Sequence, residues 1–162
     1  MLYACDGRWW DVHHAAVRRE FAGELWTQDE KAAVAFRLHR VTARWGRGFC
    51  GQPGVVFTGA NSTFQALTLA VQWGASEVAL IGVDMQNTGG RTHWHGDHAK
   101  PMRNDTPFSQ CMQHFGELAR DLAMLGVRVV NCTAVTALRC FPRERWGDYL
   151  ARIRADTAAA GI

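Results

Sequence analysis

The chain alternates short apolar runs with longer stretches in which apolar residues recur at helical spacing. Strands are expected at Leu2–Cys5, Glu24–Thr27, Ala33–Val41, Glu77–Asp84 and Val127–Val130. Helices are expected at Arg8–Phe21, from Ser62 to Trp73, at Pro107–Leu125 and at Arg143–Ala159. The glycine-rich stretch from Arg44 to Gly54 is expected to be a loop.

The run Glu77–Asp84 is the most informative of these segments. It is almost continuously apolar, which is typical of a strand buried on both faces of a parallel sheet. A helix precedes it, beginning after the turn Thr58–Ser62 and ending at Trp73–Gly74. Asn131–Thr133 is expected to cap a further short helix. The alternation predicts one α/β domain over residues 1–162, with an open, mostly parallel sheet and helices on both faces.

The composition favours a globular domain and argues against a membrane-spanning protein. With 162 residues, 48% of them hydrophobic and 20% charged, the chain has the balance of a globular domain. No apolar run approaches the roughly 20 residues that span a bilayer, and the first residues do not resemble a signal peptide, so we expect a cytoplasmic protein. The five cysteines form no C-x-x-C pair and are expected to be reduced. A formal charge of +3 is too weak to argue for nucleic acid by itself, and the arginines are scattered along the chain, which leaves a small anionic ligand open.

The loops with candidate chemistry follow the predicted strands. Ligands of open parallel sheets bind outside the carboxyl ends of the strands. Asp6–Gly7, Thr58–Ser62, Asp84–Pro107 and Asn131–Thr133 all lie at such ends in the predicted order. The helix that begins near Ser62 would also offer unpaired amide groups and the positive end of its dipole to an anion.

The segment Thr92–His98 reads THWHGDH and contains the H-x-H-x-D-H signature of the metallo-β-lactamase family. That family needs further histidine and aspartate ligands, whereas the only later histidine, His114, falls inside a predicted helix. The predicted parallel sheet also differs from the family's two stacked antiparallel sheets. Two interpretations remain open: a single metal held by His93, His95, Asp97 and His98, or a loop that folds over a ligand without metal.

Two groups of segments resemble known families. The stretches Thr58–Ser62 and Trp73–Met85 are similar to the core of Rossmann-like proteins related to bacterial CMP-sialic acid sialyltransferases and to the 6-hydroxymethylpterin diphosphokinase-like family. Thr92–His98, Val130–Thr133 and Ala137–Arg143 are more similar still to a group of uncharacterised phage proteins labelled norphogenetic. The resemblance covers nearly the whole chain and implies a nucleotide or nucleotide-sugar ligand.

The resemblance also implies roles for particular residues. His98 would be the general base that deprotonates an acceptor hydroxyl, with His95 as second choice, because the pKa of histidine lies near neutral pH. Asn61 and Ser62 would contact the phosphate, and Asp84 a sugar hydroxyl. The remaining ligand contacts would come from Asp6, Trp94, Asn131 and Thr133, with Arg91, Lys100 and Arg103 as candidates for a phosphate clamp.

One departure from the relatives leaves the function open. They begin with an additional strand and a glycine-rich loop before the element that matches Leu2–Asp6, and the given sequence has neither. We therefore expect either a rearranged sheet or self-association into a homo-oligomer that fills the gap. Three functions are predicted, in order of preference: a transferase that uses a nucleotide-activated donor, a non-catalytic phage protein that sequesters a nucleotide signal of host defence, and a metallohydrolase that uses His93, His95, Asp97 and His98.

Overall fold

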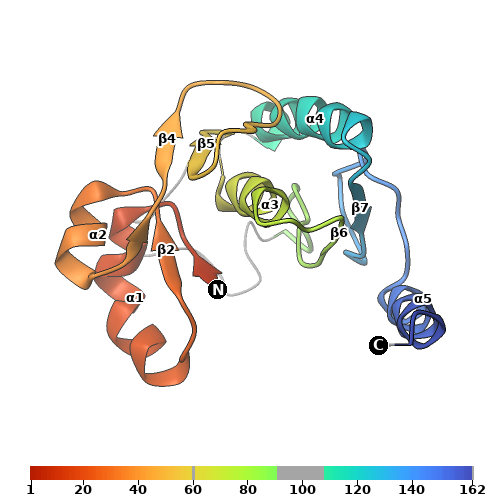
Figure 1. The fold of residues 1–162 in the computed structure, drawn as a ribbon. Coiled ribbons are helices and arrows are strands. Elements are labelled where there is room, and N and C mark those ends of the chain that lie inside the picture. The colour runs from red at the N-terminus through yellow and green to blue at the C-terminus, as the bar shows by residue number, and fades with distance from the viewer. Residues whose placement is uncertain (60, 91–107, 162) are drawn as a thin grey trace.

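Helices alternate with short strands along the chain (Figure 1). The computed structural model describes residues 1–59, 61–90 and 108–161. The strands are β1 (Leu2–Tyr3), β2 (Leu25–Thr27), β3 (His39–Arg40), β4 (Thr42–Arg44), β5 (Val55–Phe57), β6 (Glu77–Leu80) and β7 (Arg128–Asn131). The helices are α1 (Gly7–Glu20), α2 (Glu30–Phe36), α3 (Ser62–Gln72), α4 (Phe108–Met124) and α5 (Trp146–Ala159). The prediction of a mixed α/β fold is confirmed.

All strand pairs in the described residues are parallel, and they fall into small sheets ordered β1-β2-β3, β4-β5 and β6-β7. The first two sheets adjoin at Val41, the single residue between β3 and β4. The Val41 amide donates to the carbonyl of Thr27 at 2.9 Å, and the Thr42 amide donates to the carbonyl of Gly54 at 2.8 Å. Residues 39–44 therefore lie between β2 and β5.

The first helices and strands share a core made from residues near one another in sequence. Ala4, Trp10, Leu25, Ala32 and Leu38 are buried together where α1 and α2 meet the sheet of β1, β2 and β3. Trp10 is fully buried, and its indole Nε1 donates to the carbonyl of Ala4 at 3.0 Å, so burying the ring leaves no unpaired donor. We call this group the N-terminal core, and the helices α1 and α2 that contribute to it lie at the left in Figure 1.

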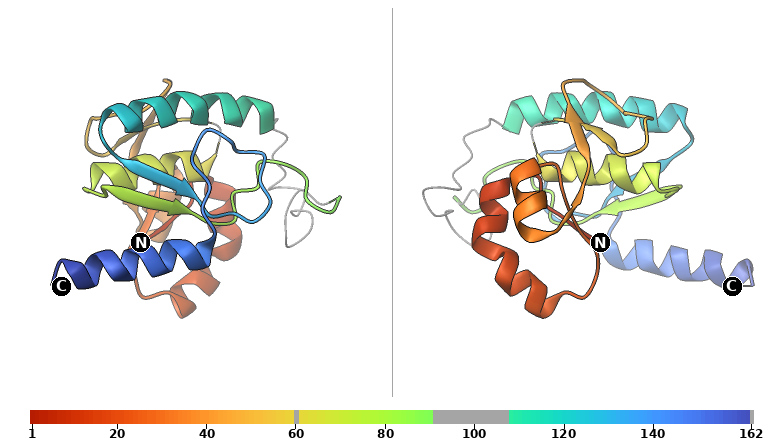
Figure 2. Two further views of the ribbon diagram at one scale, coloured as in Figure 1. Left: turned by 90° about the vertical axis from the view of Figure 1, so that its right-hand side faces the viewer. Right: turned by 60° about the vertical axis from the view of Figure 1, so that its left-hand side comes forward.

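Helix α3 lies between two groups of strands (Figures 1 and 2). Leu69 packs with Val41 and Val56 of the β4–β5 side. Phe64 and Leu67 instead belong to a larger cluster, the C-terminal core, with side chains of β6, β7 and α4. The members of the C-terminal core are Phe64, Leu67, Leu80, Val83, Phe115, Leu118, Leu122, Val129, Leu138 and Phe141. Both sides of α3 are thus apolar, as a helix between two layers requires.

Helix α5 is held to the rest of the protein by charged groups and not by an apolar core. None of its residues 146–159 is buried, and it extends along the outside of the molecule to the C-terminal end (Figure 2). Four charged groups join it to the strands: Arg152 of α5, Glu77 of β6, Arg128 of β7 and Glu144 before α5. Each guanidinium contacts both carboxylates, so we call this arrangement the Glu–Arg network.

The Glu–Arg network predicts that the docking of α5 weakens in acid. The hydrogen bond from Arg152 lowers the pKa of the Glu77 carboxyl below its ordinary value, and the charges of Arg152 and Arg128 contribute. A carboxyl with a lowered folded pKa contributes stability that is present above its unfolded pKa of about 4.3 and is lost as the pH falls through the folded value. Protection of the α5 amides against hydrogen exchange, corrected for intrinsic rate, should therefore be lower at pH 3 than at pH 6. Glu77→Gln should remove most of that difference, and an unchanged difference would contradict the assignment.

Several predicted boundaries are wrong. Ala33–Val41 is not one strand: Asp29 caps α2 by accepting from the amide of Ala32 at 2.8 Å, Arg37 ends the helix with φ 53°, and only His39–Arg40 pair as β3. The strand at Glu77 ends at Leu80 rather than Asp84, because Gly82 turns the chain with φ 73°.

Other predicted elements are found with small shifts. The helices expected at Arg8–Phe21 and Pro107–Leu125 correspond to α1 and α4, and the last helix begins at Trp146 rather than Arg143. No short helix follows Asn131, because residues 132–145 form an irregular loop. Within the described ranges, no helix is long and apolar enough to cross a membrane.

Candidate functional site

The end of β1 meets the start of α3. The hydroxyl of Ser62 accepts from the amide of Cys5 at 3.1 Å and donates to the Cys5 sulfur at 3.0 Å. One turn further along α3, Gln65 accepts from the hydroxyl of Tyr3 at 2.7 Å. These contacts fix the first turn of α3 against the residues that follow β1. We call the first turn of α3, from its N-cap Asn61 to Gln65, together with the side chains that contact it, the α3 site.

Asn61 begins α3 and contacts two further elements. Its backbone is extended, with φ −153° and ψ 164°, and its side-chain oxygen accepts from the amide of Phe64 at 2.9 Å, as an N-cap residue does. Its side-chain nitrogen lies 3.9 Å from the sulfur of Met85, which follows β6. Met85 itself adopts the left-handed φ of 50°, which is uncommon for a residue with a side chain. Asn61 therefore joins the start of α3 to the turn after β6.

Helix α4 also packs against the start of α3. Cys111 of α4 is 4% exposed, and the side chain of Asn61 lowers the pKa of its thiol. His114 follows on the same face of α4 and packs edge-on against Phe64, with ring centroids 6.1 Å apart. His114 is 9% exposed, and its Nδ1 atom is buried with no hydrogen-bond partner among the described residues. The hydroxyl of Thr58, just before α3, is likewise buried with no hydrogen-bond partner among the described residues.

The thiols of the α3 site are suited to packing rather than to nucleophilic chemistry. Burial raises the pKa of Cys5, and the hydrogen bond with Ser62 offsets this only in part. Burial likewise raises the pKa of Cys111, against a smaller opposite effect of Asn61. Both thiols are therefore protonated at neutral pH, and the protonated form is not the nucleophile. The chemistry that this site supports is binding, through helix amides, hydroxyl and amide groups.

The two predicted aspartates take part in local hydrogen bonds. Asp6 is exposed and caps α1, accepting from the amide of Arg8 at 2.9 Å. Asp84 is partly exposed and accepts from the hydroxyl of Thr88 at 2.9 Å. Each bond uses one carboxylate oxygen, so either residue keeps acceptor capacity for a ligand.

Asn131 and Thr133 organise the loop after β7. Asn131 is fully buried: its oxygen accepts from the amide of Thr133 at 3.0 Å, and its nitrogen donates to Thr136 and to the carbonyl of Leu138. The hydroxyl of Thr133 accepts from the amide of Val83 at 3.0 Å. These internal bonds give both residues a structural role, and their contact with a ligand stays a prediction.

The histidine segment lies outside the described residues. This applies to His93, Trp94, His95, Asp97 and His98, and equally to Arg91, Lys100 and Arg103. The segment 91–107 connects Gly90 to the first residue of α4. Among the residues that are described, no group of three or more histidine, cysteine, aspartate or glutamate side chains could hold a metal ion.

Sequence reasoning identified Asn61 and Ser62 but missed Cys111 and His114. The available signal was their spacing: three residues apart, they share one face of a predicted helix with Phe115 and Leu118. A histidine on such a face must be buried. Comparison with protein-family models, with curated proteins and with solved structures returns no match.

Proposed function

We propose that the chain is a nucleotide-binding protein whose α3 site receives the phosphate of the ligand, and that it transfers a group from a nucleotide-activated donor. The observation that carries the proposal is the construction of the α3 site. Residues that follow β1 and β6 contact the start of α3, and His114 of α4 packs against Phe64 in its first turn.

The physical argument begins with the helix itself. The first amides of a helix have no intrahelical acceptor, and together with the dipole they attract anions. Asn61 satisfies the amide of Phe64, which leaves those of Ser62 and Thr63 for a ligand. The parallel strands support the same placement, because ligands of open parallel sheets bind at the carboxyl ends of the strands. In this proposal the small sheets are parts of one open Rossmann-like sheet.

The rest of the ligand would extend toward the loops after β1 and β6. Asp84 would accept a hydrogen bond from a sugar hydroxyl, and Asp6 lies in the loop that follows Cys5. The resemblance of Thr58–Ser62 and Trp73–Met85 to sialyltransferase-like proteins supports a nucleotide as the ligand. In the same proposal His98 acts as general base, His95 is the second candidate, and Trp94 stacks on the ligand.

The proposal can be tested by introducing a negative charge into the first turn of α3. Thr63→Asp should lower the affinity for nucleoside monophosphates and diphosphates at least tenfold, because a carboxylate beside the phosphate repels it. The same change should preserve or raise the melting temperature, because a negative charge favours the start of a helix. Isothermal titration calorimetry measures the first effect and thermal unfolding the second.

Thr63→Asn is the matched control, since it has nearly the same shape as aspartate and no charge. It should bind within about twofold of the original protein. Equal affinity of the aspartate variant, or no saturable binding of any nucleotide across cytidine, uridine, adenosine and guanosine series, would contradict the proposal.

Catalysis and sequestration are separated by what happens to the bound molecule. A transferase converts a nucleotide-activated donor in the presence of an acceptor, whereas a sequestering protein returns it intact. Mass spectrometry of the small molecule that co-purifies with the protein, released by denaturation, identifies the nucleotide. Incubation of the same preparation with the corresponding activated donor then decides between transfer and storage.

A further inference from the structure

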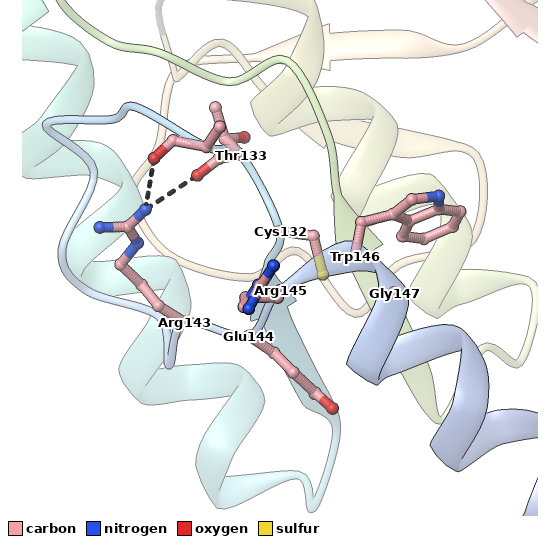
Figure 3. A pocket seen from close by; sticks show the side chains of 8 residues that line it. Cys132, Thr133, Arg143, Glu144, Arg145, Trp146 and Gly147 are labelled. Atoms are coloured by element: carbon pink, nitrogen blue, oxygen red, sulfur yellow. Dashed lines mark hydrogen bonds between the residues drawn. The ribbon is translucent and has the colours of Figure 1, made fainter.

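A hollow lies apart from the α3 site, at the start of α5 (Figure 3). Its volume is about 590 Å³, within the range of roughly 300–1,000 Å³ typical of small-molecule sites. Two stretches line it: residues 132–134, directly after β7, and residues 143–147, which lead into the first turn of α5. None of these residues belongs to the α3 site, so the hollow requires its own explanation.

The lining carries net positive charge. The carboxylate of Glu144 is compensated, because it accepts from Arg128 at 3.4 Å and from Arg152 at 3.3 Å. Arg143 donates to the backbone carbonyls of residues 133 and 134, at 3.0 and 2.8 Å, which hold the guanidinium in place without neutralising it (Figure 3). In the described part of the chain, Arg145 forms no ion pair. Two uncompensated guanidinium groups therefore adjoin the hollow.

The hollow also has an aromatic side. Trp146 is 43% exposed although it is among the largest side chains in the protein. Its ring stacks on Tyr149, with centroids 5.6 Å apart and planes at 13°, which restricts the position of the ring. In the view of Figure 3, Arg145 lies between Arg143 and Trp146. A cationic side chain and a partly exposed aromatic side chain thus both line one small-molecule-sized space.

We infer that this hollow binds a small anion that carries a flat aromatic ring, with the anionic group on Arg145 and the ring against Trp146. An arginine guanidinium matches the planar geometry of carboxylate and phosphate oxygens, and an indole stacks on aromatic rings. Thr133 lines this hollow and is also a predicted contact of the nucleotide, whereas Arg145 and Trp146 belong neither to the α3 site nor to that prediction.

The test uses 19F NMR of the full chain labelled with 5-fluorotryptophan, titrated with phenyl phosphate. The chain has seven tryptophans, and the resonance that disappears in Trp146→Phe belongs to Trp146. Phenyl phosphate should shift this resonance saturably and leave that of the fully buried Trp10 unchanged. Inorganic phosphate, which lacks the ring, should bind at least tenfold more weakly.

Two arginine variants decide whether the charge matters. Arg145→Gln should weaken phenyl phosphate binding at least tenfold, whereas Arg154→Gln, exposed on the same helix, should leave it within twofold. Both positions are exposed, so neither change threatens the fold, and the other tryptophan resonances report on this directly. A Trp146 resonance that stays still or drifts without saturation, or equal binding by the Arg145 variant, overturns the inference. Thr63→Asp should not alter this titration, which keeps the outcome independent of the proposed function.

Discussion

Replacing Phe115 by alanine should lower the free energy of unfolding by about 3–5 kcal/mol. Phe115 is fully buried in the C-terminal core. Its ring packs edge-on against Phe64 and Phe141, with centroids 5.6 and 6.2 Å away. The truncation removes both aromatic contacts and leaves a cavity between α3, α4 and the loop after β7. Because typical domains are stable by only about 5–15 kcal/mol, the loss is a large part of the total.

Urea denaturation followed by far-UV circular dichroism measures this change. Met124→Ala serves as the control, since Met124 lies on the same helix but is 81% exposed, and its loss should change stability by less than about 0.5 kcal/mol. If the Phe115 variant unfolds within 1 kcal/mol of the original protein, the C-terminal core is not packed as described.

Arg152→Glu should release α5 while leaving both cores intact. The substitution replaces two cations and two anions in the Glu–Arg network by one cation and three anions. Exposed ion pairs contribute little, but these groups are partly buried, with 29% of the Arg152 side chain and 19% of the Glu144 side chain exposed. Since α5 has no buried residue to hold it otherwise, we expect its amides to exchange at least tenfold faster.

Hydrogen exchange measured by mass spectrometry resolves peptides from α5 and α4 in the same sample. Only those from α5 should change. Arg154→Glu is the matched control: it makes the same charge change on the same helix at an exposed position, and its exchange should stay within a few-fold of the original. Similar exchange from the two variants would show that Arg152 does not hold the helix.

Prediction from sequence succeeded where a segment has a strong period. The amphipathic pattern of α4 and the apolar α3 gave the right elements, and the parallel strands followed from the alternation. It was wrong at residues 33–41, where the first part of the run belongs to α2, which begins after the Asp29 cap and ends at Phe36, and only His39–Arg40 form a strand. Apolar periodicity alone cannot distinguish a short strand from a short helix.

At the candidate site, too, the features with a local sequence signal were predicted and those without one were missed. The turn before Ser62 was predicted from its cap and its position after a strand, both of which are local signals. The approach of Cys111 and Met85 to Asn61 depends on how α4 and the turn after β6 fold back onto α3, which no local pattern encodes. The role of Asn131 could not be read either, because its partners lie five and seven residues ahead in an irregular loop.

Helix α3 would give binding of the proposed nucleotide a wide effect on the molecule. Its side chains belong to the clusters on both of its sides, and Gln65 is hydrogen-bonded to Tyr3 and Gln28 near the N-terminal core. A molecule that binds only the folded chain at 100 times its dissociation constant adds about 2.7 kcal/mol to the free energy of unfolding. Occupancy at one end of this helix would thus protect strands from both halves of the sequence against proteolysis, and the supply of ligand in the cell would set how long the protein survives.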